Sequence, residues 1–530
     1  MHAYLAIPAA ALIVALCTAQ SVAAQQLATA PTERDVAAGD TTADATSRHD
    51  LTLRDVIQEA VAHHPDLAVS TYDAAIVATD EERVAGQVNP GLNASVGVRD
   101  DRLPTVSDFQ PSETRLGQAS ATLSKPLASG ATLSIGADYS RTRQDFDSPF
   151  AAQLAKVNPA YRGGISLSYR HPLLQGVDRP TYTAGLTAAR ADADAAELQR
   201  QVVARNLSLT ALNLYFRLRS DYVGVALAKS AVARAEKFLD YQQLREKYGL
   251  IEEADRLQAE ALLATRHFDL QTAHAHQRED EAGLNRLMQR AENAPLHVTA
   301  ARRGVSARDV TVDNGLQDAI ERRPEFKIID AQLAAADARL RIARDADRSR
   351  VDLVAEFGTQ SLDGDAIDAA GGAFDTTDRF AGLSVEVTDT VGRDAAKADR
   401  RRAEFTRGRV VAQRRQLTEQ VRDELVAAHT TLVTGEQTLR AARDRVAAER
   451  QKFNAELERY RDGRSTTATL VQFENDLTTA ELQAELQQLA VNLADWQFAW
   501  SAGTLGEELD LTLSSAVQPA SSEPEPFESE

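Results

Sequence analysis

The sequence predicts an α+β chain in which long antiparallel helical hairpins alternate with groups of strands. Apolar residues recur at helical spacing over stretches much longer than an ordinary globular helix, and strictly alternating segments lie between them. This order of elements also occurs twice along the chain. Composition agrees, because only 5% of the 530 residues are aromatic, which is little bulk for filling several compact cores.

Charge and composition exclude several classes of function. The net charge of −19 would repel phosphates, so we expect no nucleic-acid partner. Beyond the N-terminal segment no apolar run approaches the ~20 residues of a membrane-spanning helix, whereas alternating strands of a membrane barrel would escape this criterion.

The sequence does not indicate an enzymatic or metal-binding function either. We find no nucleophile elbow, phosphate-binding loop or dinucleotide fingerprint, so a periplasmic enzyme is not favoured and no cofactor is expected. The neighbouring His63 and His64 and the pair His274 and His276 lack a cysteine or clustered carboxylates, so no metal site is expected.

The N-terminus is interpreted as a signal peptide over residues 1–24, although it lacks a basic start. Lipid attachment at Cys17 is left open, because Leu16 stands where a bacterial lipobox has a small residue. Residues 25–50 are expected to form a flexible lead-in, and residues 513–530 a disordered acidic tail.

The internal repeat divides the remaining chain into residues 51–299 and 300–512. Each half opens with a short amphipathic helix stopped by a proline, Pro65 or Pro324, and each contains a later glycine break. The first half is longer in its strand region, where an insert spans residues 100–162. This insert either adds strands to the sheet or projects as a long hairpin, and the sequence leaves both open.

Alternating segments predict the strands. Segments 92–98, 119–123, 131–140 and 165–170 alternate in the first half, and segments 351–357 and 383–388 in the second, with a turn at Ser129-Gly130. Alternation alone also fits a half-buried sheet in a soluble protein. Strands set between very long helices in an exported chain favour a barrel wall with apolar residues outward.

The long helices give the strongest signal. From about Asp394 to Tyr460 there is no proline, and an apolar residue recurs at every seventh position, as in a left-handed supercoil: Leu425, Leu432, Leu439, Val446, Phe453 and Tyr460. A first-half counterpart is expected over residues 188–247. An exported coiled-coil adaptor or scaffold without a membrane barrel is the alternative, but it leaves the strands unexplained.

The layout resembles the TolC family of outer-membrane export channels from about Leu51 to Leu511. The motifs that carry the resemblance are the opening Leu51-Thr52-Leu53, the duplicated proline-stopped helices, Asn89-Pro90-Gly91-Leu92, the segment from His171 to Gly176, and the two Tyr/Gly helix breaks. The resemblance implies a homotrimer whose helices form a periplasmic barrel and whose strands join one transmembrane β-barrel in the outer-membrane lipid. It further implies a passive duct of a tripartite efflux pump or type I secretion system. Its partners would be a periplasmic adaptor protein and an inner-membrane transporter.

The resemblance also suggests site residues. Asp255 matches the family's gate acid, Tyr460 matches its tyrosine partner, and Arg464 lies one position from the usual arginine. Two further tip acids of the family are replaced by Thr469 and Gln472, and a usual proline-containing turn by residues 387–392. Adaptor docking is expected at the hairpin ends, which are formed by Gly249, Leu250, Ile251, Gly463, Arg464 and Ser465. Three acids on the strands are expected to face the lumen: Asp352, Glu356 and Glu386.

Overall fold

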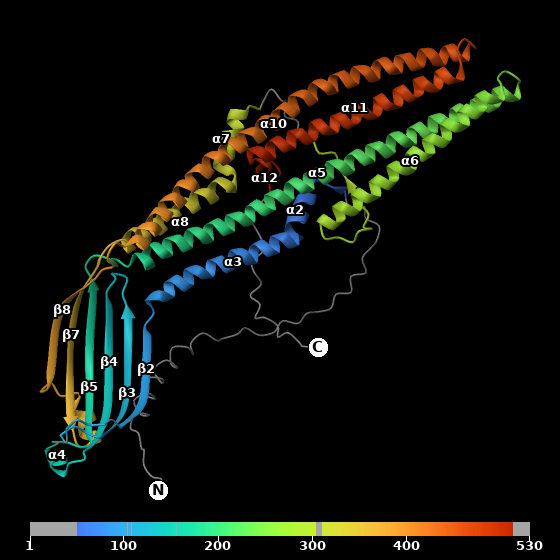
Figure 1. Cartoon of the computed structure of the whole chain (residues 1–530). Helices are drawn as coiled ribbons and strands as arrows, with labels where there is room; N and C mark the ends of the chain where they lie inside the picture. Colours follow the sequence, from blue (N-terminus) through green and yellow to red (C-terminus); the bar gives the residue numbers. More distant parts are fainter. Residues whose placement is uncertain (1–49, 103, 108, 155, 304–309, 512–530) are drawn as a thin grey trace, which may run out of the picture. The chain divides into compact units, whose positions relative to one another are not determined.

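The computed structural model describes residues 50–102, 104–107, 109–154, 156–303 and 310–511. The predicted signal peptide, nearly all of the lead-in and the acidic tail lie outside these residues. The described residues form two compact units, which we call the sheet unit (within 84–185 and 341–400) and the helical unit (50–83, 186–303, 310–340 and 401–511). Both halves of the sequence repeat contribute to both units (Figure 1).

The sheet unit contains one antiparallel sheet of six strands in the order β2-β3-β4-β5-β7-β8 (Figure 1). Each predicted alternating segment coincides with one of these strands, except that Ala131 precedes β4. The bounds are β2 Gly91–Arg102, β3 Glu113–Pro126, β4 Thr132–Asp145, β5 Ala160–Pro172, β7 Arg350–Asp363 and β8 Arg379–Thr388. The predicted insert therefore adds β3 and β4 to the sheet, between β2 and β5.

The turn between β3 and β4 is anchored at the start of helix α5 (Pro180–Lys247). Gly130 has φ +94°, and a Cβ there would lie 2.2 Å from the Gly176 carbonyl oxygen, so only glycine fits. Asp178 N–H donates to the Ser129 carbonyl at 3.1 Å, and the Arg179 guanidinium donates to the Gly130 carbonyl at 3.2 Å. The hairpin is thereby fixed to the junction that follows β5.

Short helices lie at the ends of the sheet strands. Helix α4 (Pro149–Leu154) precedes β5, and helix α9 (Ala366–Gly372) packs against β5 and β7, where Tyr139 Oη donates to the Ala366 carbonyl at 3.1 Å. A 3-10 turn, η1 (Gly86–Val88), leads into β2.

The helical unit begins each repeat as predicted, with a short capped helix that ends before a proline. Thr52 accepts from the Asp55 N–H in a capping box on α2 (Leu53–His63), and Thr311 caps α7 (Val312–Arg322). Pro65 and Pro324 then open the second helices, α3 (Pro65–Ala85) and α8 (Pro324–Ala346). A two-residue strand pair, β1 (Asp50–Leu51) with β6 (His297–Val298), joins the ends of the first repeat.

Two long helical hairpins complete this unit, and the first helix of each has 68 residues, which confirms the two very long helices predicted. Helix α5 pairs with α6 (Glu253–Leu287), and α10 (Asp394–Arg461) pairs with α11 (Thr467–Ala502), followed by α12 (Leu505–Glu508). Along the predicted seven-residue stripe, Leu425 and Leu432 are fully buried. A Cβ at Gly435 would lie 3.1 Å from Val491, so the small residue permits close approach of α10 and α11.

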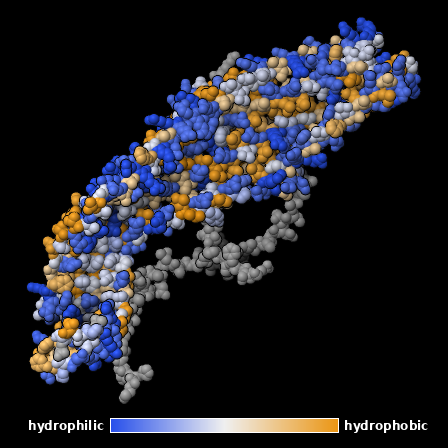
Figure 2. All heavy atoms as spheres, in the orientation of Figure 1, coloured by the Kyte–Doolittle hydropathy of each residue, from blue (hydrophilic) through white to orange (hydrophobic). Residues whose placement is uncertain are grey.

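The hydrophobic core lies between helices of both repeats. The larger cluster includes Ile57, Leu212, Tyr215, Leu284 and Trp496, and the smaller one surrounds Phe326, Leu425 and Phe498. Figure 2 shows orange hydrophobic patches along the middle of the helical unit, between hydrophilic stretches. Within the described residues, no helix is both long and apolar enough to cross a membrane.

Candidate functional site

The six-stranded sheet has one apolar and one polar face. Its registers align an apolar row across all six strands: Leu92, Leu123, Ile135, Leu167, Phe357 and Ala381. Its five larger members are 40–57% exposed in the single chain. Water is a poor environment for such a row, so this face requires a covering apolar medium or partner.

The opposite face carries small and polar side chains. One of its rows runs Gly91, Ser124, Ser134, Ser168, Glu356 and Gly382. A hollow of about 290 Å³ on this face is lined by residues that include Asp138, Ser166, Glu356 and Gln360.

The three acids expected to face a lumen lie together on this polar face. Asp352 and Glu386 are register partners, and Glu356 follows Asp352 by four residues in β7, so its side chain lies on the same face. Arg170 Nη1 lies 2.9 Å from Asp352 Oδ2 and 2.5 Å from Glu386 Oε2, and Arg350 Nε lies 2.9 Å from Asp352 Oδ2. Because two of the acids are paired with arginines, their charge is largely balanced at this point.

Both edges of the sheet are open in the single chain. Every one of the ten residues of β8 is exposed, and nearly every residue of β2 is exposed as well. Unpaired edges of this length, with apolar residues alternating along them, are templates for pairing with another strand.

The ends of the two long hairpins repeat one another in detail. Gly249 and Gly463 follow helices α5 and α10 with φ +68° and +70°. At each end the next N–H, of Leu250 or Arg464, bonds a carbonyl in the last helical turn at 2.9 or 2.8 Å. Leu250 is 63% exposed, so an apolar side chain projects at the end of the first hairpin.

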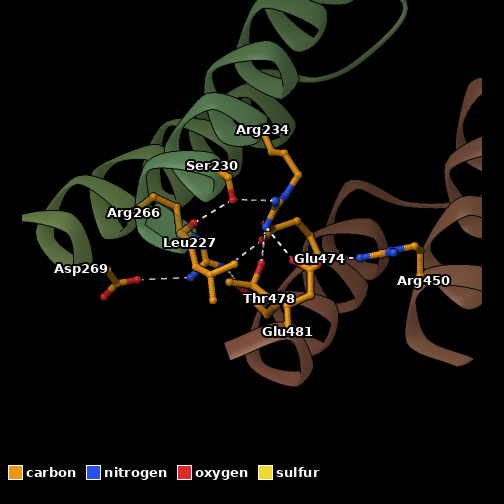
Figure 3. A network of polar contacts seen from close by, with 10 residues as sticks. Leu227, Ser230, Arg234, Arg266, Asp269, Arg450, Glu474, Thr478 and Glu481 are labelled. Carbon is orange, nitrogen blue, oxygen red and sulfur yellow. Dashed lines mark hydrogen bonds and ion pairs between the residues drawn. The ribbon is translucent and has the colours of Figure 1, made fainter. Parts of the chain in front are cut away.

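A polar network that the sequence reasoning missed joins the hairpins further from their ends (Figure 3). Glu474 of α11 lies at its centre and is 8% exposed; Arg266 Nη2 of α6 lies 2.7 Å from its carboxylate, and Arg234 Nε of α5 lies 3.3 Å away. Thr478 Oγ1 also donates to Glu474 at 2.8 Å. The two arginines are more than 200 positions from Glu474 in the sequence, so no local pattern could identify them as its partners.

No family model and no curated protein matches this chain. Solved structures do match in fold. The outer-membrane channel OprN covers 89% of this chain and 99% of its own at 16% identity, with a TM-score of 0.63. VceC, an outer-membrane protein of Vibrio cholerae, covers 86% of this chain and 95% of its own at 17% identity, with a TM-score of 0.57. The outer-membrane channel CmeC of Campylobacter jejuni covers 86% of both chains at 13% identity, with a TM-score of 0.58.

The chain has the fold of these outer-membrane channels. This confirms the fold class that the resemblance to the TolC family predicted. The alternative, an exported coiled-coil adaptor or scaffold without a membrane barrel, is not favoured, because the chain shares the channel fold over most of its length.

Within this channel fold, the three predicted gate residues do not meet in a single chain. Tyr460 is buried against α5, where its hydroxyl donates to Gln242 Oε1 at 2.8 Å and lies 3.0 Å from Thr467 Oγ1. Arg464 pairs with Asp462 at 2.5 Å. In the described part of the chain, no hydrogen bond or ion pair joins Asp255 to either residue. A gate made of Asp255, Tyr460 and Arg464 therefore requires contacts with a neighbouring copy.

The described residues contain no group of three or more His, Cys, Asp or Glu arranged to hold a metal ion.

A carboxyl pair between α5 and α6 gives the first hairpin of the channel fold a pH dependence. Burial, and then the hydrogen bond and charge of Asp280, raise the pKa of Asp221 to about 7, while Arg217 opposes the shift. Asp280 is itself held by Arg217 at 2.6 Å, and Glu279 adds a further negative charge nearby. Asp221 Oδ2 has no hydrogen-bond partner.

Because the folded-state pKa of Asp221 lies above the unfolded value, its protonation favours folding below about pH 4, and this contribution is lost as the pH rises through about 7. We expect Asp221→Asn to be more stable than the parent at pH 8, by about 1 kcal/mol for a half-exposed group, and by a smaller amount at pH 5, where the folded protein still holds the proton. Thermal unfolding of both proteins, followed by helical circular dichroism at the two pH values, tests this. An equal effect at pH 5 and pH 8 would contradict the assignment.

Proposed function

We propose that the chain is the outer-membrane component of an export system, a passive channel that spans the outer membrane and extends into the periplasm. The observation that carries the proposal is the sheet itself, whose apolar row crosses all six strands while small polar residues cover the other face. Hydrocarbon covers the first face in this arrangement, and water fills the space on the second. The channel conducts and carries out no reaction.

Closure of the wall is supplied by other copies of the chain. A sheet with an even number of strands has edge strands that run in opposite directions, so β8 of one copy pairs antiparallel with β2 of the next. We propose three copies, as the resemblance to the TolC family implies. Their helical hairpins then form the periplasmic barrel.

The hairpin ends are the proposed docking surface for a periplasmic adaptor protein, which joins the channel to an inner-membrane transporter of a tripartite pump or type I secretion system. Gly249, Leu250 and Ile251 form one end, and Gly463, Arg464 and Ser465 form the other. The neighbouring Tyr248 and Leu250 support this role, because both are more than 60% exposed and give this end an apolar surface for an adaptor to cover.

A matched pair of substitutions tests the membrane assignment. Ser166 and Leu167 are adjacent in β5 and lie on opposite faces. We expect Leu167→Arg to cost about 2–4 kcal/mol in the membrane and to abolish recovery of oligomers from outer membranes, whereas Ser166→Arg should be tolerated. Detergent extraction followed by native mass spectrometry measures both. A parent protein released without detergent as a single copy would overturn the proposal.

The gate remains a proposal as well, with Asp255, Tyr460 and Arg464 contributed across neighbouring copies. Each exposed ion pair between Asp255 and Arg464 would stabilise the closed state by only about 0.2–1 kcal/mol, but the three symmetry copies act on one aperture. Charge reversal at Asp255 or Arg464 should therefore raise single-channel conductance in planar bilayers. Unchanged conductance in both single variants and the double variant would remove these residues from the gate.

A further inference from the structure

We infer that the hairpin β3–β4 is part of the membrane wall, so that three copies close a wall of eighteen strands around a wide water-filled bore. This inference rests on the proposed function, and it adds the width of the wall and hence the class of cargo. Six strands per chain set the count, and β3 and β4 supply two of them.

The registers give the first argument. β3 pairs with β2 from Gly91 to Arg102 and with β4 over its full length, and β4 pairs with β5 from Thr132 to Thr142. The hairpin therefore lies within the sheet, with ladders on both sides. A hairpin projecting from the wall would leave β2 paired directly with β5.

The pattern of side chains gives the second argument. Leu123 and Ile135 continue the apolar row between Leu92 and Leu167 without interruption. On the other face Ser124 and Ser134 are register partners, and their hydroxyl oxygens lie 3.1 Å apart. Both strands thus carry the same two-faced pattern as their neighbours, which is what a membrane wall requires.

The anchored turn between β3 and β4 gives the third argument. Gly130 packs on the Gly176 carbonyl, and the bonds from Asp178 and Arg179 hold the turn to the β5–α5 junction. Free hairpins have no such attachment at their tip.

The width follows from strand geometry. Eighteen strands about 4.8 Å apart and tilted by roughly 40° enclose a bore of about 36 Å between backbones. Walls of this size leave an aqueous channel. Serine, glycine and threonine make up about half of the inward side chains. Longer ones such as Arg170 and Glu356 extend into the bore, so its open width is smaller than the distance between backbones. The sheet end therefore admits hydrated cargo bulkier than drug-sized molecules, and size selection falls to other parts of the channel.

Cysteine labelling tests the position of the hairpin. Cys17 is the sole cysteine of the sequence, so parent protein supplies the background signal. We compare Ser124→Cys and Ser134→Cys with Leu123→Cys and Ile135→Cys in proteoliposomes, using a charged maleimide. The serine positions should react at least tenfold faster. Ser166→Cys and Leu167→Cys in β5 serve as the reference pair.

The outcomes separate the two proposals. Faster labelling of serine positions than of apolar positions, in the hairpin and in the reference pair, supports the eighteen-stranded wall if native mass spectrometry also finds three copies. We call this difference in labelling rate alternation. Alternation in the reference pair alone, or a complex of two copies, overturns this inference while the membrane channel stands. Loss of alternation in the reference pair would instead overturn the proposed function.

A deletion gives a second measurement. Removing residues 113–145 joins β2 to β5 while keeping them antiparallel, because an even number of strands is lost. Three shortened chains would close a wall of twelve strands. Polyethylene glycols of graded size, added on the sheet side, then measure the bore, and the diameter of the largest polymer that enters should fall by about one third. An unchanged exclusion size would contradict a wall role for the hairpin.

Discussion

Replacing Glu325 by alanine should destabilise the helical unit by about 3–5 kcal/mol, the largest effect we expect from a single substitution. Its carboxylate lies 2.5 Å from Arg205 Nη1 and 3.0 Å from Arg323 Nη2, and the side chains of these arginines are 7% and 4% exposed. Alanine at position 325 would remove the carboxylate that both buried guanidinium groups share. Only Arg323 has a second carboxylate, from Glu424 at 2.8 Å.

The electrostatics of the cluster support this size of effect. Burial, and then the charge of Arg323, lower the pKa of Arg205 to about 10, against the opposing charge of Glu325. Burial would raise the pKa of Glu325, but the bond from Arg323 and the charges of both arginines outweigh it and lower that pKa. Its stabilising contribution is therefore present above about pH 4.5 and is lost as the pH falls through the lowered value.

A matched control lies on the same helix. Asp330 pairs with Arg414 at 3.2 Å, but the two side chains are 57% and 46% exposed, so Asp330→Ala should cost less than about 1 kcal/mol. Chemical unfolding of the parent, Glu325→Ala, Glu325→Gln and Asp330→Ala measures these costs. The amide of Glu325→Gln keeps the shape and should give an intermediate loss. Equal losses for Glu325→Ala and Asp330→Ala would contradict the assignment.

Local patterns predicted most of the elements of this fold. The stripe from Leu425 to Tyr460 predicted α10 within a residue of its ends, because an apolar repeat and the absence of proline act within one helix. For α5 the prediction began eight residues late, since the helix starts at Pro180, a residue suited to the first helical position, ahead of the apolar stripe. Alternation identified β3 and β4 as strands, but it does not decide whether β2 pairs with β3, as it does here, or directly with β5.

The site was less accessible to sequence reasoning. The stripe identified Tyr460 as buried, yet its hydroxyl partner Gln242 lies 218 positions away and has no signature of its own. Likewise Glu325 and Glu474 look like ordinary helical acids in the sequence. Their importance comes from arginines that only the packing of separate helices brings within reach.

The second large effect is expected at Glu474, in the network of Figure 3. Glu474→Ala removes the carboxylate shared by Arg234 of α5 and Arg266 of α6, whose side chains are 31% and 11% exposed. We expect a loss of about 3 kcal/mol, because Arg266 in particular is left buried with Asp269 at 3.2 Å as its remaining acid.

The consequence should be local as well as global. Glu474 is the point at which α11 of the second hairpin is bonded to both helices of the first. Its loss weakens that link, leaving the bonds from Arg234 to Thr478 and from Arg266 to Asn475, so the hairpin segments beyond it should open more often. Amide hydrogen exchange should accelerate over residues 230–270 and 467–480, with little change around the core cluster of Leu212 and Tyr215.

The same network offers its own control. Arg450 of α10 pairs with Glu481 at 2.8 Å, but its side chain is 59% exposed. Arg450→Ala should therefore change stability by less than about 1 kcal/mol and leave exchange in α5 and α6 unaltered. If the hairpins are held together mainly at Glu474, the Glu474→Ala channel should also conduct more than the parent in planar bilayers, while Arg450→Ala should not. Equal conductance in all three proteins, with faster exchange in Glu474→Ala, would show that this contact stabilises the hairpins without restricting the aperture.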